Sequence, residues 1–189
     1  MSQVSSASMI LTLGLAGLVS GLAIVGVYTV TKPRIERNKA EALQRAVFEV
    51  VPGAADMSEV SEWGEGETVY AAVDAQGELL GYAVPAAGAG FQDTIELLYG
   101  LDPTAEHTLG MRVLESRETP GLGDKIIKDE SFVGQFDHLP VKQELVTVKG
   151  GATAEHEVDA ITGATISSKA VVNIINQANS TWQERLRER

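Results

Sequence analysis

Residues 159–169 read Asp-Ala-Ile-Thr-Gly-Ala-Thr-Ile-Ser-Ser-Lys and lie where a predicted extended segment meets the C-terminal helix. Downstream, apolar residues recur every four positions, which is the spacing of one apolar face of an amphipathic helix. This face consists of Ile166, Ala170, Ile174, Ala178, Trp182 and Leu186, joined by Val171 and Ile175. Thr162 to Thr165 therefore lie at a helix N-terminus, where free backbone N–H groups and the positive end of the helix dipole attract anions.

The small residues at this helix start leave room for a ligand. Gly163 and Ala164 cannot shield the backbone or the Thr165 hydroxyl, so a phosphate group could approach both closely. A simpler interpretation is a capped helix, in which Thr162 or Thr165 accepts a hydrogen bond from an amide two or three residues further on. Four hydroxyl residues crowd the start, although one is enough for a cap: Thr162, Thr165, Ser167 and Ser168.

A second motif, Glu118-Thr119-Pro120-Gly121-Leu122-Gly123, predicts a tight turn. Proline presets position i+1 of such a turn, and glycine allows the positive φ of position i+2. Leu122 would then stand out as an apolar surface for a flat aromatic ring, with Glu118 and Thr119 making polar contacts to the ring edge. Taken alone, the motif is most simply an ordinary surface turn.

Together the two motifs resemble those of FMN-binding domains in the G subunit of Rnf electron-transport complexes and the C subunit of sodium-pumping NADH:quinone reductase. Residues 159–167 match the flavinylation motif Asp-x-x-(Ser/Thr)-Gly-Ala-Thr-x-(Ser/Thr) of that family. The resemblance implies that Thr165 carries FMN through a phosphoester bond to its hydroxyl oxygen. It implies further cofactor contacts from Thr162, Gly163, Ala164, Glu118, Thr119, Leu122 and Gly123.

The resemblance also implies how the flavin is attached. A separate flavin transferase would supply it during maturation, and would recognise Asp159, Gly163, Ala164 and Ser167. Two further pairs, Gly81-Tyr82 and Gly90-Phe91, resemble family positions near the ring, although they are less specific than the two motifs.

The composition narrows the possible functions. The chain has 189 residues and no cysteine, which excludes disulfides, thiolate-bound iron–sulfur clusters and a cysteine nucleophile. His107, His138 and His156 are too scattered to predict a metal site. The formal net charge of −11 makes nucleic acid and anionic lipid surfaces poor partners. We therefore expect no metal, no nucleic acid and no catalytic residue of the chain's own.

An uncharged apolar run covers residues 9–30, after a short tail at residues 1–8. At about 1.5 Å per residue the run spans about 33 Å, which is enough to cross a hydrocarbon core of about 30 Å. A cleaved signal peptide would have a basic leading region, a shorter apolar core and a small-residue cleavage site, whereas Lys32-Pro33-Arg34 follows this run. We interpret the run as an uncleaved membrane helix.

Two arguments conflict over the side on which the following domain lies. Lys32, Arg34, Arg37 and Lys39 follow the apolar run and no basic side chain precedes it, so the positive-inside rule places the domain in the cytoplasm. The resemblance implies a single-pass protein of the bacterial inner membrane with its flavin domain on the periplasmic side. We favour the periplasmic side, because other subunits can override the rule.

The rest of the sequence predicts an α+β domain with a mainly antiparallel sheet flanked by helices. A connecting helix at residues 31–53 ends at Pro52-Gly53 and leads into the FMN-binding domain at residues 54–189. Residues 88–91 are expected to form a flexible loop, and residues 124–137 a short helical or irregular stretch. Strands are predicted at 68–73, 79–84, 95–101, 108–114 and 144–148, with a hairpin turn at 74–77.

These observations predict a membrane-anchored electron-transfer subunit of an Rnf-type, redox-driven ion-translocating complex. It would carry covalent FMN on Thr165, have other membrane subunits of the complex as partners, and catalyse no reaction alone. One alternative is the C subunit of sodium-translocating NADH:quinone reductase, which tends to be longer. The other is a non-redox, membrane-anchored binding module whose helix start captures an anion or is simply capped.

Overall fold

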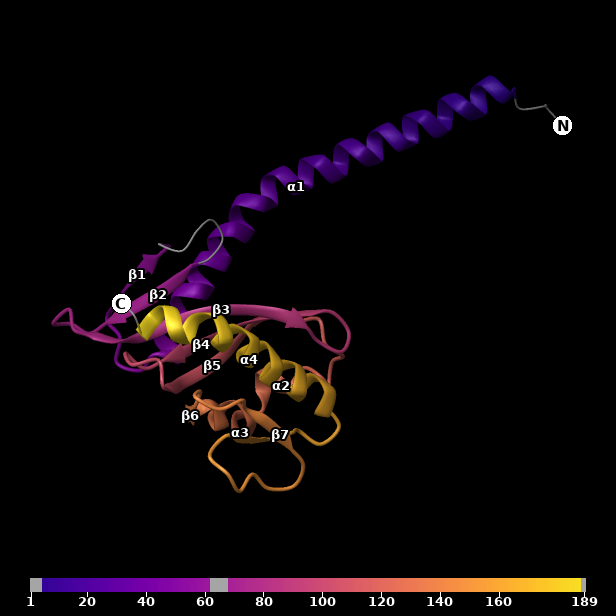
Figure 1. Cartoon of the computed structure of the whole chain (residues 1–189). Coiled ribbons are helices and arrows are strands. Elements are labelled where there is room, and N and C mark those ends of the chain that lie inside the picture. Colours follow the sequence, from indigo (N-terminus) through magenta and orange to yellow (C-terminus); the bar gives the residue numbers. More distant parts are fainter. Residues whose placement is uncertain (1–4, 62–67, 188–189) are drawn as a thin grey trace. The chain divides into compact units, whose positions relative to one another are not determined.

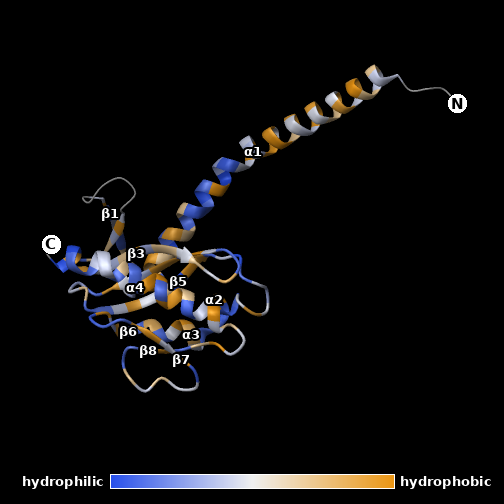
Figure 2. Ribbon diagram, turned by 45° about the vertical axis from the view of Figure 1, so that its right-hand side comes forward, coloured by the Kyte–Doolittle hydropathy of each residue, from blue (hydrophilic) through white to orange (hydrophobic). Residues whose placement is uncertain are grey.

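The computed structural model describes residues 5–61 and 68–187, and the chain divides into two compact units, residues 1–42 and 43–189. The N-terminal unit is the first part of a single helix, α1 (Ser6–Val50), which begins apolar and then becomes polar (Figure 2). Within the described residues, α1 is the one helix long and apolar enough to cross a membrane. Residues 9–30, predicted as a membrane helix, and residues 31–50 of the predicted connecting helix form this one helix, which continues through Pro33 and ends at Val50, before residues 51–53.

The C-terminal unit is built on a six-stranded antiparallel sheet whose strands follow the chain order (Figure 1). A separate parallel pair is formed by the short strands β7 (Val146–Val148) and β8 (Glu157–Asp159). The strands of the large sheet are β1 (Asp56–Val60), β2 (Val69–Val73), β3 (Leu79–Ala89), β4 (Thr94–Leu101), β5 (His107–Glu115) and β6 (Asp137–Pro140). The remaining helices are α2 (Lys125–Lys128), α3 (Glu130–Val133), the 3-10 helix η1 (Gly134–Phe136) and α4 (Thr165–Arg187).

The predicted α+β class is confirmed, and so is the hairpin between β2 and β3. The Asp74 N–H donates to the Glu78 carbonyl at 2.9 Å across this turn, and Gly77 has a φ of +85°. The sequence did not predict β1, β6 or β8. These strands have only five, four and three residues, too few for an alternating pattern to stand out.

The loop predicted at residues 88–91 is wrong in its first half, because β3 continues to Ala89, which pairs with Thr94 of β4. Gly88 belongs to the strand for a packing reason. A Cβ at this position would lie 2.6 Å from Cγ1 of Ile174 on α4, so glycine lets the helix approach the sheet closely.

Successive residues along the strands face opposite sides of the sheet, and each side packs on a helix. On one side, Leu97 belongs to the larger buried cluster together with Val171 of α4. On the other side, Leu98 belongs to a smaller cluster with Val47, from the part of α1 that lies in the C-terminal unit. The sheet is therefore a middle layer, and α4 crosses one of its faces (Figure 1).

The apolar face predicted for α4 is wrong at its first position, because Ile166 is 57% exposed. Ser167 and Ser168 are buried there instead. The Ser168 hydroxyl accepts from the Ile161 N–H at 3.1 Å and donates to the Ala164 carbonyl at 3.0 Å, which turns this side of the helix toward the preceding chain. Ile166 consequently faces outward.

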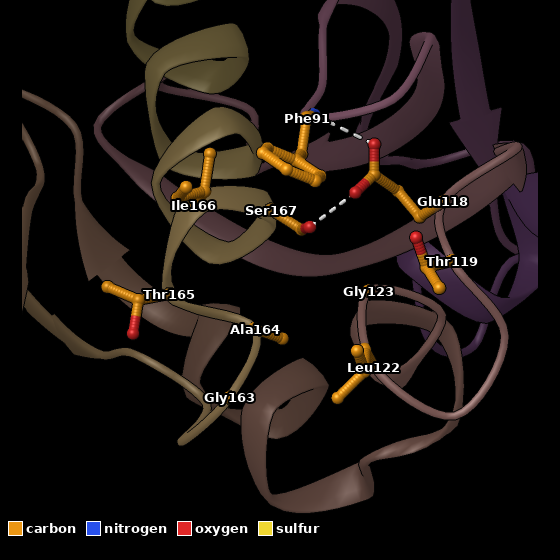
Figure 3. A pocket seen from close by; sticks show the side chains of 10 residues that line it. All are labelled: Phe91, Glu118, Thr119, Leu122, Gly123, Gly163, Ala164, Thr165, Ile166 and Ser167. Carbon is orange, nitrogen blue, oxygen red and sulfur yellow. Dashed lines mark hydrogen bonds between the residues drawn. The ribbon is translucent and has the colours of Figure 1, made fainter.

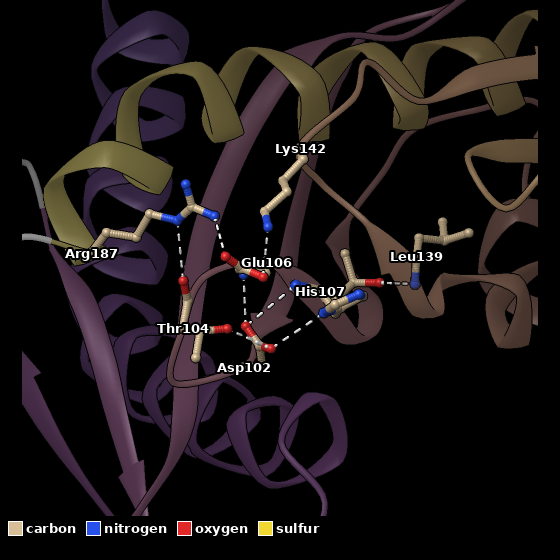
Figure 4. Close-up of polar contacts among 8 residues, drawn as sticks. Asp102, Thr104, Glu106, His107, Leu139, Lys142 and Arg187 are labelled. Atoms are coloured by element: carbon tan, nitrogen blue, oxygen red, sulfur yellow. Dashed lines mark hydrogen bonds and ion pairs between the residues drawn. The ribbon is translucent and has the colours of Figure 1, made fainter.

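A polar network fastens the last turn of α4 to the β4–β5 connection (Figure 4). The Arg187 guanidinium donates to Glu106 Oε1 at 2.6 Å and to the Thr104 carbonyl at 3.3 Å. Lys142 binds the second Glu106 oxygen at 2.8 Å, while Asp102 Oδ1 accepts from the Glu106 N–H at 2.7 Å. These contacts hold the end of α4 that is remote from Thr165.

Candidate functional site

Three segments that are distant in the sequence form one pocket of about 280 Å³ at the start of α4 (Figure 3). One segment is the turn after β3, the second is the loop after β5, and the third is the beginning of α4. The lining residues are Phe91, Glu118, Thr119, Leu122, Gly123, Gly163, Ala164, Thr165, Ile166 and Ser167. The pocket is close to the lower limit of the roughly 300–1,000 Å³ typical of small-molecule sites, so it suits a ring system better than a whole nucleotide.

The Pro120-Gly121 turn forms as the sequence predicted. The Leu122 N–H donates to the Thr119 carbonyl at 3.1 Å, and Gly121 at position i+2 has a φ of +78°. Asp124 accepts from the Gly121 N–H at 2.7 Å, and this hydrogen bond stabilises the turn. Leu122 stands out from it with 51% of its surface exposed and lines the pocket.

Backbone groups, and not threonine side chains, stabilise the start of α4. Gly163 has a φ of +86°, and the Ala164 N–H donates to the Ile161 carbonyl at 2.9 Å. In the part of the chain that the structure describes, neither the Thr162 nor the Thr165 hydroxyl makes a hydrogen bond. The described residues therefore lack the cap expected from one of these threonines. The first backbone N–H groups of α4 also have no acceptor among the described residues.

Glu118 is the buried charge of the site, with only 5% of its surface exposed. Its Oε1 accepts from the N–H groups of Phe91 and Gln92 at 2.8 and 2.9 Å, and its Oε2 accepts from the Ser167 hydroxyl at 2.5 Å. Burial raises the pKa of Glu118, but the hydrogen bonds from Ser167, Gln92 and Phe91 outweigh it and leave the pKa below its ordinary value. The side chain is therefore a carboxylate at neutral pH.

Two predicted site residues lie outside the pocket. Thr162 is exposed and lines a separate hollow together with Asp159. The Asp159 carboxylate accepts from the N–H groups of Gly151 and Ala152 at 2.7 and 2.9 Å, so it supports the loop before β8. Tyr82, expected near the ring, is buried in the core on the α4 side of the sheet and does not line the pocket.

The pocket includes one residue that the sequence analysis placed elsewhere, Ile166, and one that it singled out only weakly, Phe91. Phe91 is 60% exposed, so Phe91, Leu122 and Ile166 present apolar surface to solvent around one pocket. Phe91 could have been predicted as a site residue because it is a large aromatic residue beside Gly90 in an expected loop. The apolar period of α4 concealed Ile166, because its spacing from Ala170 is the spacing of a core residue.

The site combines an apolar pocket with carboxylates that the protein itself binds. Its walls are mainly apolar, and the residues described in the structure contain no cluster of histidine and acidic side chains that could bind a metal. The carboxylates of the two motifs, Glu118 and Asp159, accept hydrogen bonds from protein donors. Thr165 lines the pocket, and its hydroxyl makes no hydrogen bond with the residues that the structure describes.

Two family models match the chain. Residues 9–50 match the model described as the RnfG N-terminal region, and residues 90–180 match the model of the FMN-binding domain. The second match contains every residue that lines the pocket.

Comparison with curated proteins gives relatives that align over most of the chain. The chain is 37% identical over 175 residues to the G subunit of an ion-translocating oxidoreductase complex from Methanosarcina acetivorans, covering 89% of this chain and 90% of the relative. It is 32% identical to the G subunit of a proton-translocating ferredoxin:NAD(+) oxidoreductase complex from Clostridium ljungdahlii, covering 85% and 82%.

Solved structures share the fold. The structure of Shewanella oneidensis NqrC has a TM-score of 0.56 and 23% identity, covering 72% of this chain and 73% of that one. The C subunit of the Na(+)-translocating NADH-quinone reductase from Parabacteroides distasonis has a TM-score of 0.55 and 26% identity, covering 63% and 62%.

Proposed function

Because the chain belongs to the family of ion-translocating oxidoreductase (Rnf) complex G subunits, we propose that it carries FMN covalently on Thr165 and relays electrons within such a complex. The observation that carries the proposal is the position of the Thr165 hydroxyl. Thr165 lines an apolar pocket at the N-terminus of a long helix, and its hydroxyl makes no hydrogen bond among the described residues. The match of residues 9–50 to the RnfG model favours this assignment over the C subunit of the quinone reductase.

The residues of the site fit the two ends of FMN. The first N–H groups of α4 are anion-binding donors, and Gly163 and Ala164 leave the backbone open to a phosphate attached at Thr165. Leu122 and Ile166 offer apolar contact to a flat ring, and Phe91 adds an aromatic face. FMN bound there would supply one- and two-electron redox chemistry, while the chain holds and shields it.

Attachment needs an external enzyme, because the site offers Thr165 no base of its own. Unactivated hydroxyls are weak nucleophiles, and the carboxylates of the two motifs, Glu118 and Asp159, are engaged with protein donors. A flavin transferase that uses FAD would supply the base. The Thr165 oxygen then bonds to the phosphorus of the FMN half, the pyrophosphate bond breaks, AMP leaves, and the hydroxyl proton passes to the transferase.

The remaining elements of the proposal concern location and partners. The apolar part of α1 would anchor the chain in the cytoplasmic membrane, with the flavin domain on the outer side, periplasmic in a bacterium. A covalent bond suits that side, since a dissociable cofactor released there would be diluted, whereas a tether keeps it at high local concentration. Other membrane subunits of the complex would be the partners of the anchored chain.

Thr165→Val tests the attachment site. Valine keeps the shape of threonine and removes only the oxygen, so the domain should fold without covalent flavin. The readout is flavin fluorescence of the full chain on a denaturing gel, after expression with a flavin transferase. The matched control is Thr162→Val, which should stay fluorescent because Thr162 lies outside the pocket. A fluorescent Thr165→Val band, or loss of fluorescence in Thr162→Val alone, contradicts the assignment.

A further inference from the structure

We propose that Glu118 is a positioning residue that clamps the three segments of the pocket together and does not contact the flavin ring. Its two oxygens face different segments. Oε1 accepts from Phe91 and Gln92 in the turn after β3, and Oε2 accepts from Ser167 in the first turn of α4 (Figure 3). Glu118 itself belongs to the loop that carries Leu122. One carboxylate thus joins every segment that lines the pocket.

The packing around Glu118 supports this role independently of its hydrogen bonds. A Cβ at Gly90 would lie 2.5 Å from Glu118 Oε1, and a Cβ at Gly123 would lie 2.7 Å from Oε2. The carboxylate is therefore enclosed from both sides by backbone that only glycine allows to come so close. With 5% of the residue exposed and both oxygens accepting hydrogen bonds from the protein, the carboxylate is committed to the fold.

A carboxylate suits the clamp because it only accepts, and all three of its partners donate. Hydrogen bonds to a charged acceptor are stronger than those between neutral groups, which favours a fixed geometry. The consequence for the site is indirect. By fixing the backbone at Phe91, Glu118 sets the position of this apolar wall of the pocket relative to Leu122. By binding Ser167, it sets the positions of Phe91 and Leu122 relative to Thr165. The proposal rests on the proposed function only in treating this pocket as the flavin site.

The first test uses protein without flavin, so that it does not depend on the proposed function. In full-length Thr165→Val protein in detergent, we measure hydrogen exchange at the Phe91 and Gln92 amides. Glu118→Ala should speed exchange at both by at least about tenfold, as expected when a hydrogen bond to a charged group is lost. Glu118→Gln should restore protection, because its carbonyl can accept from both amides and its NH₂ group can donate to Ser167.

The control for this test is Glu96→Ala, which removes an exposed glutamate from the adjacent strand β4 and should leave exchange unchanged. Unchanged exchange in Glu118→Ala overturns the clamp. So does a Glu118→Gln protein that exchanges as fast as Glu118→Ala, because a side chain that can form the same three hydrogen bonds would then fail to protect the two amides.

The second test concerns the loaded protein and includes a milder variant in case Glu118→Ala does not fold. Ser167→Ala removes only the bond to α4 and leaves the Phe91 and Gln92 bonds in place. In the molecules that carry covalent FMN, it should lower the fluorescence anisotropy of the ring and leave exchange at Phe91 and Gln92 within about twofold of the parent. An anisotropy equal to that of the parent shows that the link to Ser167 does not position the site, and overturns the proposal.

Discussion

At the residue scale, the hydroxyl groups at the start of α4 divide into two that the fold uses, on Ser167 and Ser168, and two that make no hydrogen bond among the described residues, on Thr162 and Thr165. Ser168 closes the helix start through Ile161 and Ala164, and Ser167 binds Glu118. Of the two unengaged residues, Thr165 lines the pocket and Thr162 does not. A hydroxyl that the fold does not use is the one most available to a modifying enzyme.

Leu122 is the residue whose change should separate ring packing from attachment. In Leu122→Ala we expect FMN to stay on Thr165, because the covalent bond does not depend on the loop. A Leu-sized contact contributes about 1.5–3 kcal/mol when buried, so the ring should become more mobile and more exposed to water. Flavin fluorescence anisotropy and the midpoint reduction potential of the purified chain measure this change.

Leu79→Ala is the control for Leu122→Ala. Leu79 is also a partly exposed leucine, but it begins β3 and does not line the pocket. It should leave both the anisotropy and the potential of the flavin unchanged. Values for Leu122→Ala that equal those of the parent protein would show that this loop is not at the ring.

At the scale of elements, the position of α4 on the sheet determines where Thr165 lies. The helix is held at its far end by Arg187 and along its length by apolar packing, including the close approach of Ile174 to Gly88 of β3. Because the helix is rigid, its first turn is placed by contacts several turns away. The strand glycine is thus part of the architecture of the site without lining it.

Gly88→Ala tests this approach. The added methyl group would lie 2.6 Å from Ile174 Cγ1, so we expect a loss of about 1–3 kcal/mol in the free energy of unfolding, as is usual for overpacked cores. Combining it with Ile174→Ala should destabilise the protein by less than the sum of the two single changes. Denaturant unfolding of the full chain in detergent, followed by the fluorescence of its tryptophans, measures these values.

Gly134→Ala provides the reference for Gly88→Ala. Gly134 has open space around its Cβ position and a φ of −66°, so alanine should be neutral or slightly stabilising there. Equal stabilities of Gly88→Ala and Gly134→Ala, or strict additivity with Ile174→Ala, would contradict the close approach of α4 to β3.

At the scale of the whole molecule, the charges that follow the apolar part of α1 bear on the proposed orientation. Four basic residues follow the apolar part of α1, and two of them form exposed ion pairs one turn on, Lys32 with Glu36 at 3.7 Å and Arg37 with Glu41 at 3.2 Å. The positive-inside rule counts basic residues and not net charge, so these pairs do not remove the conflict.

Reporter fusions decide the orientation. A reporter enzyme that is active only outside the cytoplasm, fused after residue 189, should be active in cells if the flavin domain lies outside. The same fusion lacking residues 9–30 should be inactive, because the anchor that carries the domain across is gone. Activity of a cytoplasm-only reporter at the same position would show instead that the basic residues set the orientation.

What the sequence determined by itself is local: the uncharged run of residues 9–30, the period of α4 from Ala170 onward, and the turn at Pro120-Gly121 all follow from side-chain size, charge and backbone freedom over a few residues. Only the tertiary structure decided the rest. It turned Ile166 outward, placed Thr162 and Asp159 outside the pocket, and enclosed Glu118 among donors from two other segments. The physical reason is that burial and hydrogen bonding depend on chain segments distant in sequence, which packing alone brings together.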